Sequence, residues 1–266
     1  ILFLATLAMV GIVALTLIGW IDRIAQIANH NHLLHQIEDA ARAALAARMR
    51  KPFLGGRELK TPSATGAVLK ARRAGYVANI DANSIDGGAK KIGCTVEVLT
   101  LPGAFVCKGE ALLRLPERET VDDAAGDELL DAIAQTDTRT FEQDPQYCLQ
   151  VLVEVATRAL SPGVNDPATA VLAIDGCYRV LADWRCDAEG EPAEPDHPHI
   201  KARGLDGGAL LADSLGEIAR HGAAAPKVAV RIQDAFAALR AHTSDPAFAE
   251  AAAAEAAIAL ERSEAA

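Results

Sequence analysis

The first 21 residues of the chain carry no charged side chain, and most of them are apolar. A helix rises about 1.5 Å per residue, so this run spans roughly 30 Å, the thickness of the hydrocarbon core of a bilayer. Trp20 and then Asp22 and Arg23 end the run with the aromatic and charged edge that is typical where a helix leaves lipid. We therefore expect a transmembrane helix over residues 1–21.

A buried core helix and a signal peptide are the alternatives for this run. A core helix is usually shorter and polar on one face, and a signal peptide starts with a basic segment and ends at a small-residue cleavage site. Residues 1–21 show neither pattern. Because the chain starts at Ile1 and not at Met, we expect this helix to be the last of several, with the upstream part missing.

A helical period continues beyond the apolar run. Apolar residues recur at helical spacing at Ile24, Ile27, Leu34, Ile37, Ala41 and Leu45. Pro52 and the pair Gly55 and Gly56 then end the pattern. We expect a juxtamembrane helix over residues 22–51, whose apolar stripe forms either the seam of a homo-oligomer or a packing surface for the protein's own soluble domain.

The period changes between residues 65 and 116. Short apolar or alternating runs predict strands at Ala67–Ala71, Tyr76–Ile80 and Thr95–Leu101. The string PGAFVCKGEALLRL that follows, residues 102–115, resembles the turn of biotinyl and lipoyl carrier domains, in which two strands and a Gly turn close a barrel-sandwich. We therefore expect a small β-rich, barrel-sandwich-like module over residues 60–116.

No cofactor and no metal site is expected. Carrier domains attach their prosthetic group to a lysine at a hairpin tip, whereas Lys90 and Lys91 lie in GGAKKIG without the flanking methionines or acidic residue of a carrier hairpin. Of His30, His32 and His35, only the last two share a helix face. A metal site there would need a third ligand, which the sequence does not place.

From residue 126 onward the pattern is helical again. Amphipathic segments predict helices over Cys148–Leu160, Pro167–Leu181, Leu205–His221, Pro226–His242 and Asp245–Arg262. Residues 184–199 are rich in Pro, Gly and acidic side chains and predict a solvated loop. The predicted fold class is thus an α+β membrane protein, with an N-terminal transmembrane helix, the β-rich module, and a C-terminal α-helical bundle over residues 126–262.

Charge is distributed unevenly along the chain. Residues 22–73 contain ten basic and four acidic residues, a net charge of +6, whereas the whole chain carries −10. By the positive-inside tendency we expect the C-terminal region in the cytoplasm at the inner (plasma) membrane, with the basic residues near lipid headgroups. The acidic remainder argues against nucleic acid as a partner. Five cysteines without CxxC spacing indicate a reducing compartment.

The string SPGVNDPATA, residues 161–170, is the most specific candidate site. Its first residues stop one helix, and Asn165 or Asp166 can cap the next. Free amides and side-chain oxygens at that helix N-terminus suit an anion, a cation or a substrate, although helix capping alone would select the same residues. Charged residues upstream would converge on this turn if their helix folds back. The candidate ligand-binding residues are Glu142, Asp144, Arg158, Ser161, Asn165 and Asp166.

Residues 139–176, RTFEQDPQYCLQVLVEVATRALSPGVNDPATAVLAIDG, resemble the signature of the predicted bacterial membrane proteins grouped as the domain of unknown function 2254. The strings GYVANID and PGAFVCKGEALL match that family's pattern as well, so the resemblance covers about residues 60–180. One departure is CLQVLVE at 148–154, where the family pattern has a Gly-Ile-Arg-Gln type of start; the missing Arg puts a charge role at that position in doubt. The resemblance implies hydrophobic spans followed by a soluble C-terminal region, and it implies no reaction.

Three functions fit these observations, and the sequence does not specify a reaction. The first is a membrane-anchored regulatory or interaction module with a cytoplasmic soluble domain, whose partners are the bilayer and a protein or small ligand; the absence of a nucleophile–base motif or a phosphate loop favours it. The second is a channel or transporter subunit gated by the soluble domain, but the apolar run has no ionisable residue to mark an ion route. The third is an enzyme that uses Glu142, Asp144 or Asp166 as an acid, a base or a cation ligand. An enzyme is the least favoured of the three, and we assign no catalytic residue.

Overall fold

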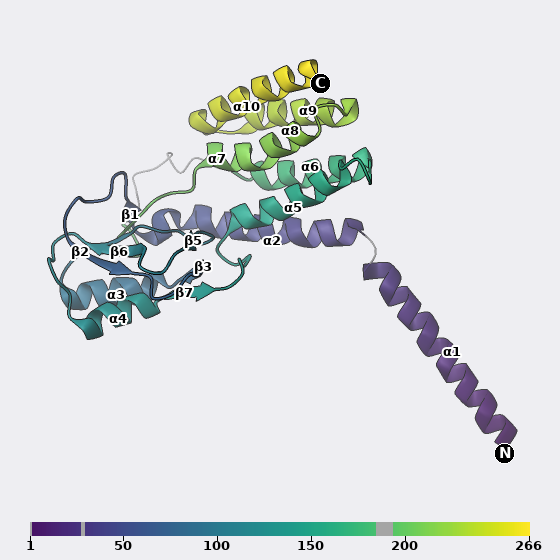
Figure 1. Cartoon of the computed structure of the whole chain (residues 1–266), viewed down its shortest axis with the longest axis horizontal. Coiled ribbons are helices and arrows are strands. Elements are labelled where there is room, and N and C mark those ends of the chain that lie inside the picture. Colours follow the sequence, from purple (N-terminus) through teal and green to yellow (C-terminus); the bar gives the residue numbers. More distant parts are fainter. Residues whose placement is uncertain (1, 28–29, 185–193) are drawn as a thin grey trace.

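The computed structural model describes residues 2–27, 30–184 and 194–266. Figure 1 shows the first helix, α1 (Leu2–Ile27), extending away from the rest of the molecule, where sheets lie at one end and packed helices at the other. The second helix, α2 (His30–Arg50), contacts α1 and runs along the packed helices toward the sheets. The juxtamembrane segment 22–51 therefore contains the end of α1 and all of α2.

The transmembrane helix expected over residues 1–21 is wrong. An α-helix needs about 20 consecutive apolar residues to cross the hydrocarbon core. Within residues 2–27, 30–184 and 194–266, no helix is both long enough and apolar enough to do so. The helix also does not stop where the apolar run stops, because α1 continues past Asp22 and Arg23 to Ile27.

The strands form two sheets. The described strands are β1 (Arg57–Glu58), β2 (Ala67–Lys70), β3 (Gly75–Ile80), β4 (Val96–Val98), β5 (Phe105–Val106), β6 (Ala111–Leu115), β7 (Ile133–Thr136) and β8 (Ile200–Ala202). One sheet has the order β1-β8-β4-β6-β2, and the other has the order β5-β3-β7. In the first sheet β8 pairs in parallel with both β1 and β4, which brings residues 200–202 between strands that lie far earlier in the chain.

The barrel-sandwich-like module expected over residues 60–116 is therefore wrong as well. Its strands are divided between the two sheets, and β7 and β8 join them from outside that range. Residues Ala82–Ile92 form a helix, α3, because Ile85 and Ala89, one turn apart, are buried in the core beneath it. Lys90 and Lys91 thus lie in the last turn of a helix and not at a hairpin tip. A second helix, α4 (Asp123–Asp131), packs against α3. We call the two sheets together with α3 and α4 the β unit.

The remaining described elements are helical. They are α5 (Pro145–Ala159), α6 (Pro167–Leu181), α7 (Gly207–Leu211), the π-helical turn η2 (Ala212–Gly216), α8 (Glu217–His221), α9 (Pro226–His242) and α10 (Pro246–Ala265). With α2 they form the helical unit, in which α5 and α6 lie between α2 and the C-terminal pair α9 and α10 (Figure 1). The helix expected over Leu205–His221 appears as α7, η2 and α8 in succession.

Helix α2 belongs to the core of the helical unit. Leu34, Ile37, Ala41 and Leu45, the apolar stripe predicted from the sequence, are buried in the same core as α5 and α6. The β unit has a separate core. The last residues of α2, and the 3₁₀ turn η1 (Pro52–Gly55) after it, lead from one unit to the other.

Candidate ligand-binding site

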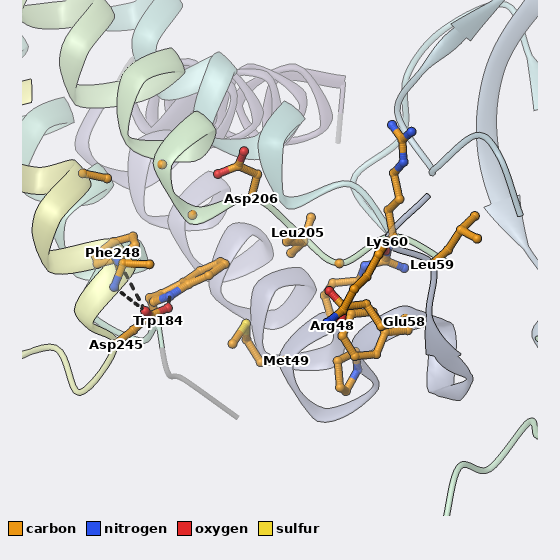
Figure 2. Close-up of a pocket in the computed structure, with 18 residues that line it drawn as sticks. Arg48, Met49, Glu58, Leu59, Lys60, Trp184, Leu205, Asp206, Asp245 and Phe248 are labelled. Atoms are coloured by element: carbon orange, nitrogen blue, oxygen red, sulfur yellow. Dashed lines mark hydrogen bonds and ion pairs between the residues drawn. The ribbon is translucent and has the colours of Figure 1, made fainter. Parts of the chain in front are cut away.

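A cavity of about 710 Å³ lies between the β unit and the helical unit. Its lining comes from the end of α2 and η1, from β1 and the residues after it, from Trp184, from the connection between β8 and α7 with the start of α7, and from α10. Figure 2 shows an aromatic side, with Trp184 and Phe248, facing a charged side, with Arg48 and Lys60. Cavities of this size hold small organic ligands in many proteins.

The aromatic side is tightly packed. The rings of Trp184 and Phe248 are stacked, with their centroids 5.3 Å apart and an angle of 11° between their planes. The indole Nε1 of Trp184 donates a hydrogen bond to Asp245 at 2.9 Å. Gly207 lies against both rings, and an added Cβ there would come within 2.7 Å of Phe248 and 2.8 Å of Trp184. Only glycine fits this position without displacing the aromatic pair.

Two carboxylates of the cavity are engaged at helix N-termini. Asp245 accepts hydrogen bonds from the N–H groups of Ala247 at 2.9 Å and Phe248 at 3.2 Å, and so caps α10. Asp206 accepts one from the N–H of Ala209 at 3.1 Å and caps α7. A capping carboxylate satisfies amides that have no partner within the helix. These charges therefore stabilise the walls of the cavity.

Arg48 is the buried charge of the cavity. The residue is 8% exposed, and its Nη2 donates a hydrogen bond to the carbonyl oxygen of Arg203 at 3.4 Å. Burial lowers the pKa of Arg48 to about 10, because removal from water disfavours the charged form. Within the described residues no carboxylate forms an ion pair with Arg48, whereas the exposed Lys60 lies 3.7 Å from Glu58.

Arg48 also lines a second cavity, of about 370 Å³, on the side of the β unit where α3 begins. Asp81, at the edge of this cavity, caps α3 by accepting the N–H of Ser84 at 3.2 Å. Gln143 accepts the N–H of Ile80 at 3.0 Å and so fixes the segment before α5 to the sheet. A single guanidinium thus lies between two cavities.

The structure separates the predicted site residues into two groups. Glu142 lines the second cavity. Asp144, two residues later, is buried and caps α5 by accepting the N–H of Tyr147 at 2.9 Å. Arg139 donates to both oxygens of Asp144, at 2.7 and 2.9 Å. Asp144 is therefore held as a structural ion pair at the start of α5.

The other predicted residues lie at the opposite end of α5. The helix has 15 residues, so its ends are about 22 Å apart. The hydroxyl of Ser161 donates to the carbonyl oxygen of Arg158 at 2.7 Å, and the N–H of Asn165 donates to the carbonyl oxygen of Ser161 at 2.9 Å. The structure brings these residues and Asp166 together in one turn and does not bring Glu142 or Asp144 to them.

The turn itself has the geometry of a helix cap. Asp166 accepts hydrogen bonds from the N–H groups of Ala168 at 3.1 Å and Thr169 at 3.2 Å, and from the Thr169 hydroxyl at 2.6 Å. Asn165 has a positive φ of 47°, a conformation that asparagine tolerates better than most residues. Capping accounts for these contacts, and a ligand at this turn stays a prediction.

Sequence reasoning missed Arg48, although the sequence carries a signal for it. The buried stripe of α2 runs through Ala41 and Leu45 at helical spacing, and the next position of that stripe is residue 48. A charged residue on an apolar helix stripe is removed from water and needs a polar partner. Because Arg48 also belongs to the basic segment 22–73, net charge alone does not distinguish it from the exposed cations around it.

Comparison with known proteins decides the family. A family model described as "Predicted membrane protein (DUF2254)" matches residues 1–238. The chain belongs to this family. The DUF2254 match includes α1, the β unit and the helical unit as far as α9, and it ends before α10, which contributes Phe248 to the aromatic side of the cavity. The family description names a membrane protein and gives no activity.

The DUF2254 chain is also similar to curated proteins of mycobacteria. It is 32% identical over 115 residues to an uncharacterized protein of Mycobacterium tuberculosis strain H37Rv and equally to one of Mycobacterium bovis. The aligned part is 42% of this chain and 22% of each relative, so the chain matches about a fifth of the length of these relatives. No solved structure matches.

Proposed function

We propose that this DUF2254 chain is a membrane-associated regulatory module, in which a ligand binds between the β unit and the helical unit and its occupancy is passed along α2. The observation that carries this proposal is the lining of the 710 Å³ cavity, which draws on both units and on the end of α2. A ligand that contacts two units favours one relative arrangement over others. That differential contact is the physical basis of a regulatory response.

Helix α2 is suited to pass on such a change. Its apolar stripe is buried against α5 and α6, and Glu38 of α2 accepts two hydrogen bonds from Arg179 of α6, both at 2.6 Å. Close-packed interiors transmit displacements because they contain little free volume. A shift at Arg48 or Met49, at the cavity end of α2, therefore reaches the opposite end of the helix, which adjoins α1.

The family description supports association with a membrane. The basic excess of residues 22–73 is attracted to the anionic lipids of the cytoplasmic leaflet and so favours the cytoplasmic side of the inner membrane for the two units. The bilayer, a second copy of the chain and a protein that receives the signal are the partners that this proposal includes.

The distance between the two units tests the proposal. In the full chain with Cys186→Ser, one nitroxide is placed on the exposed Cys107 of the β unit and one on a cysteine replacing the exposed Arg240 of α9. Pulsed electron spin resonance then measures the distance while divalent cations, nucleotides and organic anions are added in turn. A label pair at Arg240 and Arg262, both in the helical unit and with Cys107→Ser, serves as the control.

A compound that raises the melting temperature and shifts the distance between the units, but not the control distance, supports the regulatory module. A compound that raises the melting temperature and leaves both distances unchanged overturns it, because binding would then have no mechanical consequence. The proposal also fails if no class of compound changes either quantity.

A further inference from the structure

The charge of Arg48 has no counter-ion within the described residues, although the residue is 8% exposed. A buried guanidinium is normally matched by a carboxylate, because removal from water is costly for an unpaired charge. The one hydrogen bond that the structure gives Arg48 goes to a neutral carbonyl oxygen at 3.4 Å. A guanidinium has five N–H donors in a planar fork, and the four that remain are arranged to hold a planar or tetrahedral anion.

The carboxylates that line the 710 Å³ cavity do not compensate this charge. Asp245 accepts the indole N–H of Trp184 and caps α10, and Asp206 caps α7. Glu58 lies on the exposed surface 3.7 Å from Lys60. The charge that is left without a partner in the cavity is therefore positive, and the ligand that complements it is an anion.

The opposite side of the cavity selects for an apolar group. Trp184 and Phe248 present stacked rings, and Met49 and Leu205 lie between them and the charged side (Figure 2). A volume of about 710 Å³ exceeds what an inorganic anion fills. Trp184 and Phe248 are only 8% and 2% exposed, so an apolar group of the ligand contributes to binding chiefly by removing its own surface from water.

We propose that the cavity binds an amphipathic organic anion, with its carboxylate or phosphate on Arg48 and its apolar part against Trp184 and Phe248. This inference rests on the proposed function, since it names the ligand class of the same cavity. A fatty acid or phospholipid of the membrane and a soluble metabolite share this chemistry.

Trp184 itself reports on the site. The chain contains two tryptophans, so Trp20→Phe in the full chain leaves Trp184 as the only indole. Its fluorescence is measured during titration with octanoate, with octanol as the neutral analogue and with inorganic phosphate as the anion without an apolar part. Octanoate is expected to saturate the signal at the lowest concentration of the three.

Three variants separate the charge from the fold. Arg48→Met is expected to weaken octanoate binding by about tenfold to a hundredfold, the range for loss of charge-assisted hydrogen bonds, and to leave octanol unchanged. Arg48→Lys keeps a positive charge but lacks the planar guanidinium, and its affinity for octanoate is expected to lie between those of the parent and of Arg48→Met. Arg50→Met removes an exposed cation of the same helix and is the matched control, expected to bind as the parent does.

The source of the anion is distinguished by vesicles. A fluorescence change with phosphatidylcholine vesicles that contain oleate, and none with pure phosphatidylcholine, assigns the site to a membrane-borne ligand; a change with dissolved octanoate alone assigns it to a soluble one. The proposal is overturned if octanoate binds no more tightly than octanol to the Trp20→Phe chain, a result that needs no substitution in the cavity. Equal binding by parent and a folded Arg48→Met also overturns it. Octanoate binding without a change in the distance between the units would leave this inference standing and overturn the regulatory function.

Discussion

The carboxylate of Asp144 occupies the space that a side chain at position 103 would need. A Cβ built on Gly103 would lie 2.5 Å from Cγ of Asp144, and Gly103 has a φ of 94°. Asp144 begins α5, and Gly103 belongs to the turn that ends at β5. Two strings by which the sequence resembles its family, PGAFVCKGEALL and RTFEQDPQY, therefore meet where the β unit joins the helical unit.

Gly103→Ala is expected to lower the free energy of unfolding by about 2 to 4 kcal/mol, because it adds both backbone strain at positive φ and a clash with Asp144. Urea denaturation of the full chain measures the loss. Gly109→Ala is the matched control, since Gly109 has a φ of 88° but nothing within 4 Å of an added Cβ. This control carries the strain alone and is expected to cost about 1 kcal/mol. Equal losses in the two variants would show that contact with Asp144 contributes nothing.

The ion pair between Glu38 and Arg179 joins α2 to α6 and predicts a dependence of stability on pH. The Arg179 guanidinium holds the pKa of Glu38 below its usual range by hydrogen bonding, and burial opposes this in part. A carboxylate with a lowered pKa stabilises the fold above its unfolded pKa of about 4.3, and this contribution is lost as the pH falls through the folded value. The effect is moderate because Arg179 is partly exposed and water screens the pair.

Glu38→Gln is accordingly expected to reduce the free energy of unfolding by about 1 to 2 kcal/mol at pH 7, and the difference from the parent should fade below about pH 4. Urea denaturation over this pH range makes the measurement. Asp183→Asn breaks the exposed pair with Arg42, whose atoms are 2.7 Å apart, and is expected to cost less than about 1 kcal/mol. A difference between Glu38→Gln and the parent that stays constant down to pH 3 would rule out the ion pair as its cause.

The apolar stripe of α2 illustrates what the sequence could predict. Leu34, Ile37, Ala41 and Leu45 recur at helical spacing because one face of the helix is buried, and the structure buries all four. The surface against which they pack, α5 and α6, lies more than a hundred residues away and leaves no trace in the local pattern. The period of the apolar residues identifies the buried face of a helix, but it does not identify the surface against which that face packs.

Strand β8, which lies beside β4 in the five-stranded sheet, is an element that the sequence pattern did not predict. β8 has only the residues Ile200–Ala202, too few to display a period of two, and it pairs with β1 and β4 at long separation in sequence. Composition predicts a solvated loop over residues 184–199, of which 185–193 lie outside the described residues; Trp184 and His197, near its two ends, are buried. The candidate cavity depends on Trp184 and on the residues after β8, so local composition could not predict it.

The turn at residues 161–170 yields a prediction that separates capping from ligand binding. Asp166→Ala removes the acceptor for the amides of Ala168 and Thr169 and is expected to lower the free energy of unfolding by about 1 to 2 kcal/mol. Asp166→Asn keeps a capping acceptor and is expected to cost little. Thermal shifts of both variants with divalent cations and small anions complete the measurement.

If the turn only caps α6, both variants respond to added ions as the parent does. The free energy of unfolding is then lowered in Asp166→Ala, which has no capping acceptor, and nearly unchanged in Asp166→Asn, which keeps one. A stabilisation by an ion that is lost in Asp166→Asn, where the cap is retained, would show that the charge of Asp166 binds a ligand.

The cysteines of the two cores differ in reactivity from the one on the surface. Cys107 is exposed, whereas Cys94, Cys148 and Cys177 are buried. Burial raises the pKa of Cys148 and of Cys177 to about 12. Because the thiolate is the reactive form, these thiols are expected to react far more slowly than Cys107 with a disulfide reagent near pH 8.

The measurement uses Cys186→Ser, so that the four described cysteines remain. We expect one thiol to react rapidly in the folded chain and four after denaturation. Cys107→Ser should abolish the rapid phase, which assigns it. Cys177 lies in α6 beside the Glu38 and Arg179 pair, so rapid reaction at Cys177 would mean that α2 separates from α6 under native conditions. The same experiment on Glu38→Gln tests this directly: a faster reaction at Cys177 than in the parent is expected if that ion pair holds the two helices together.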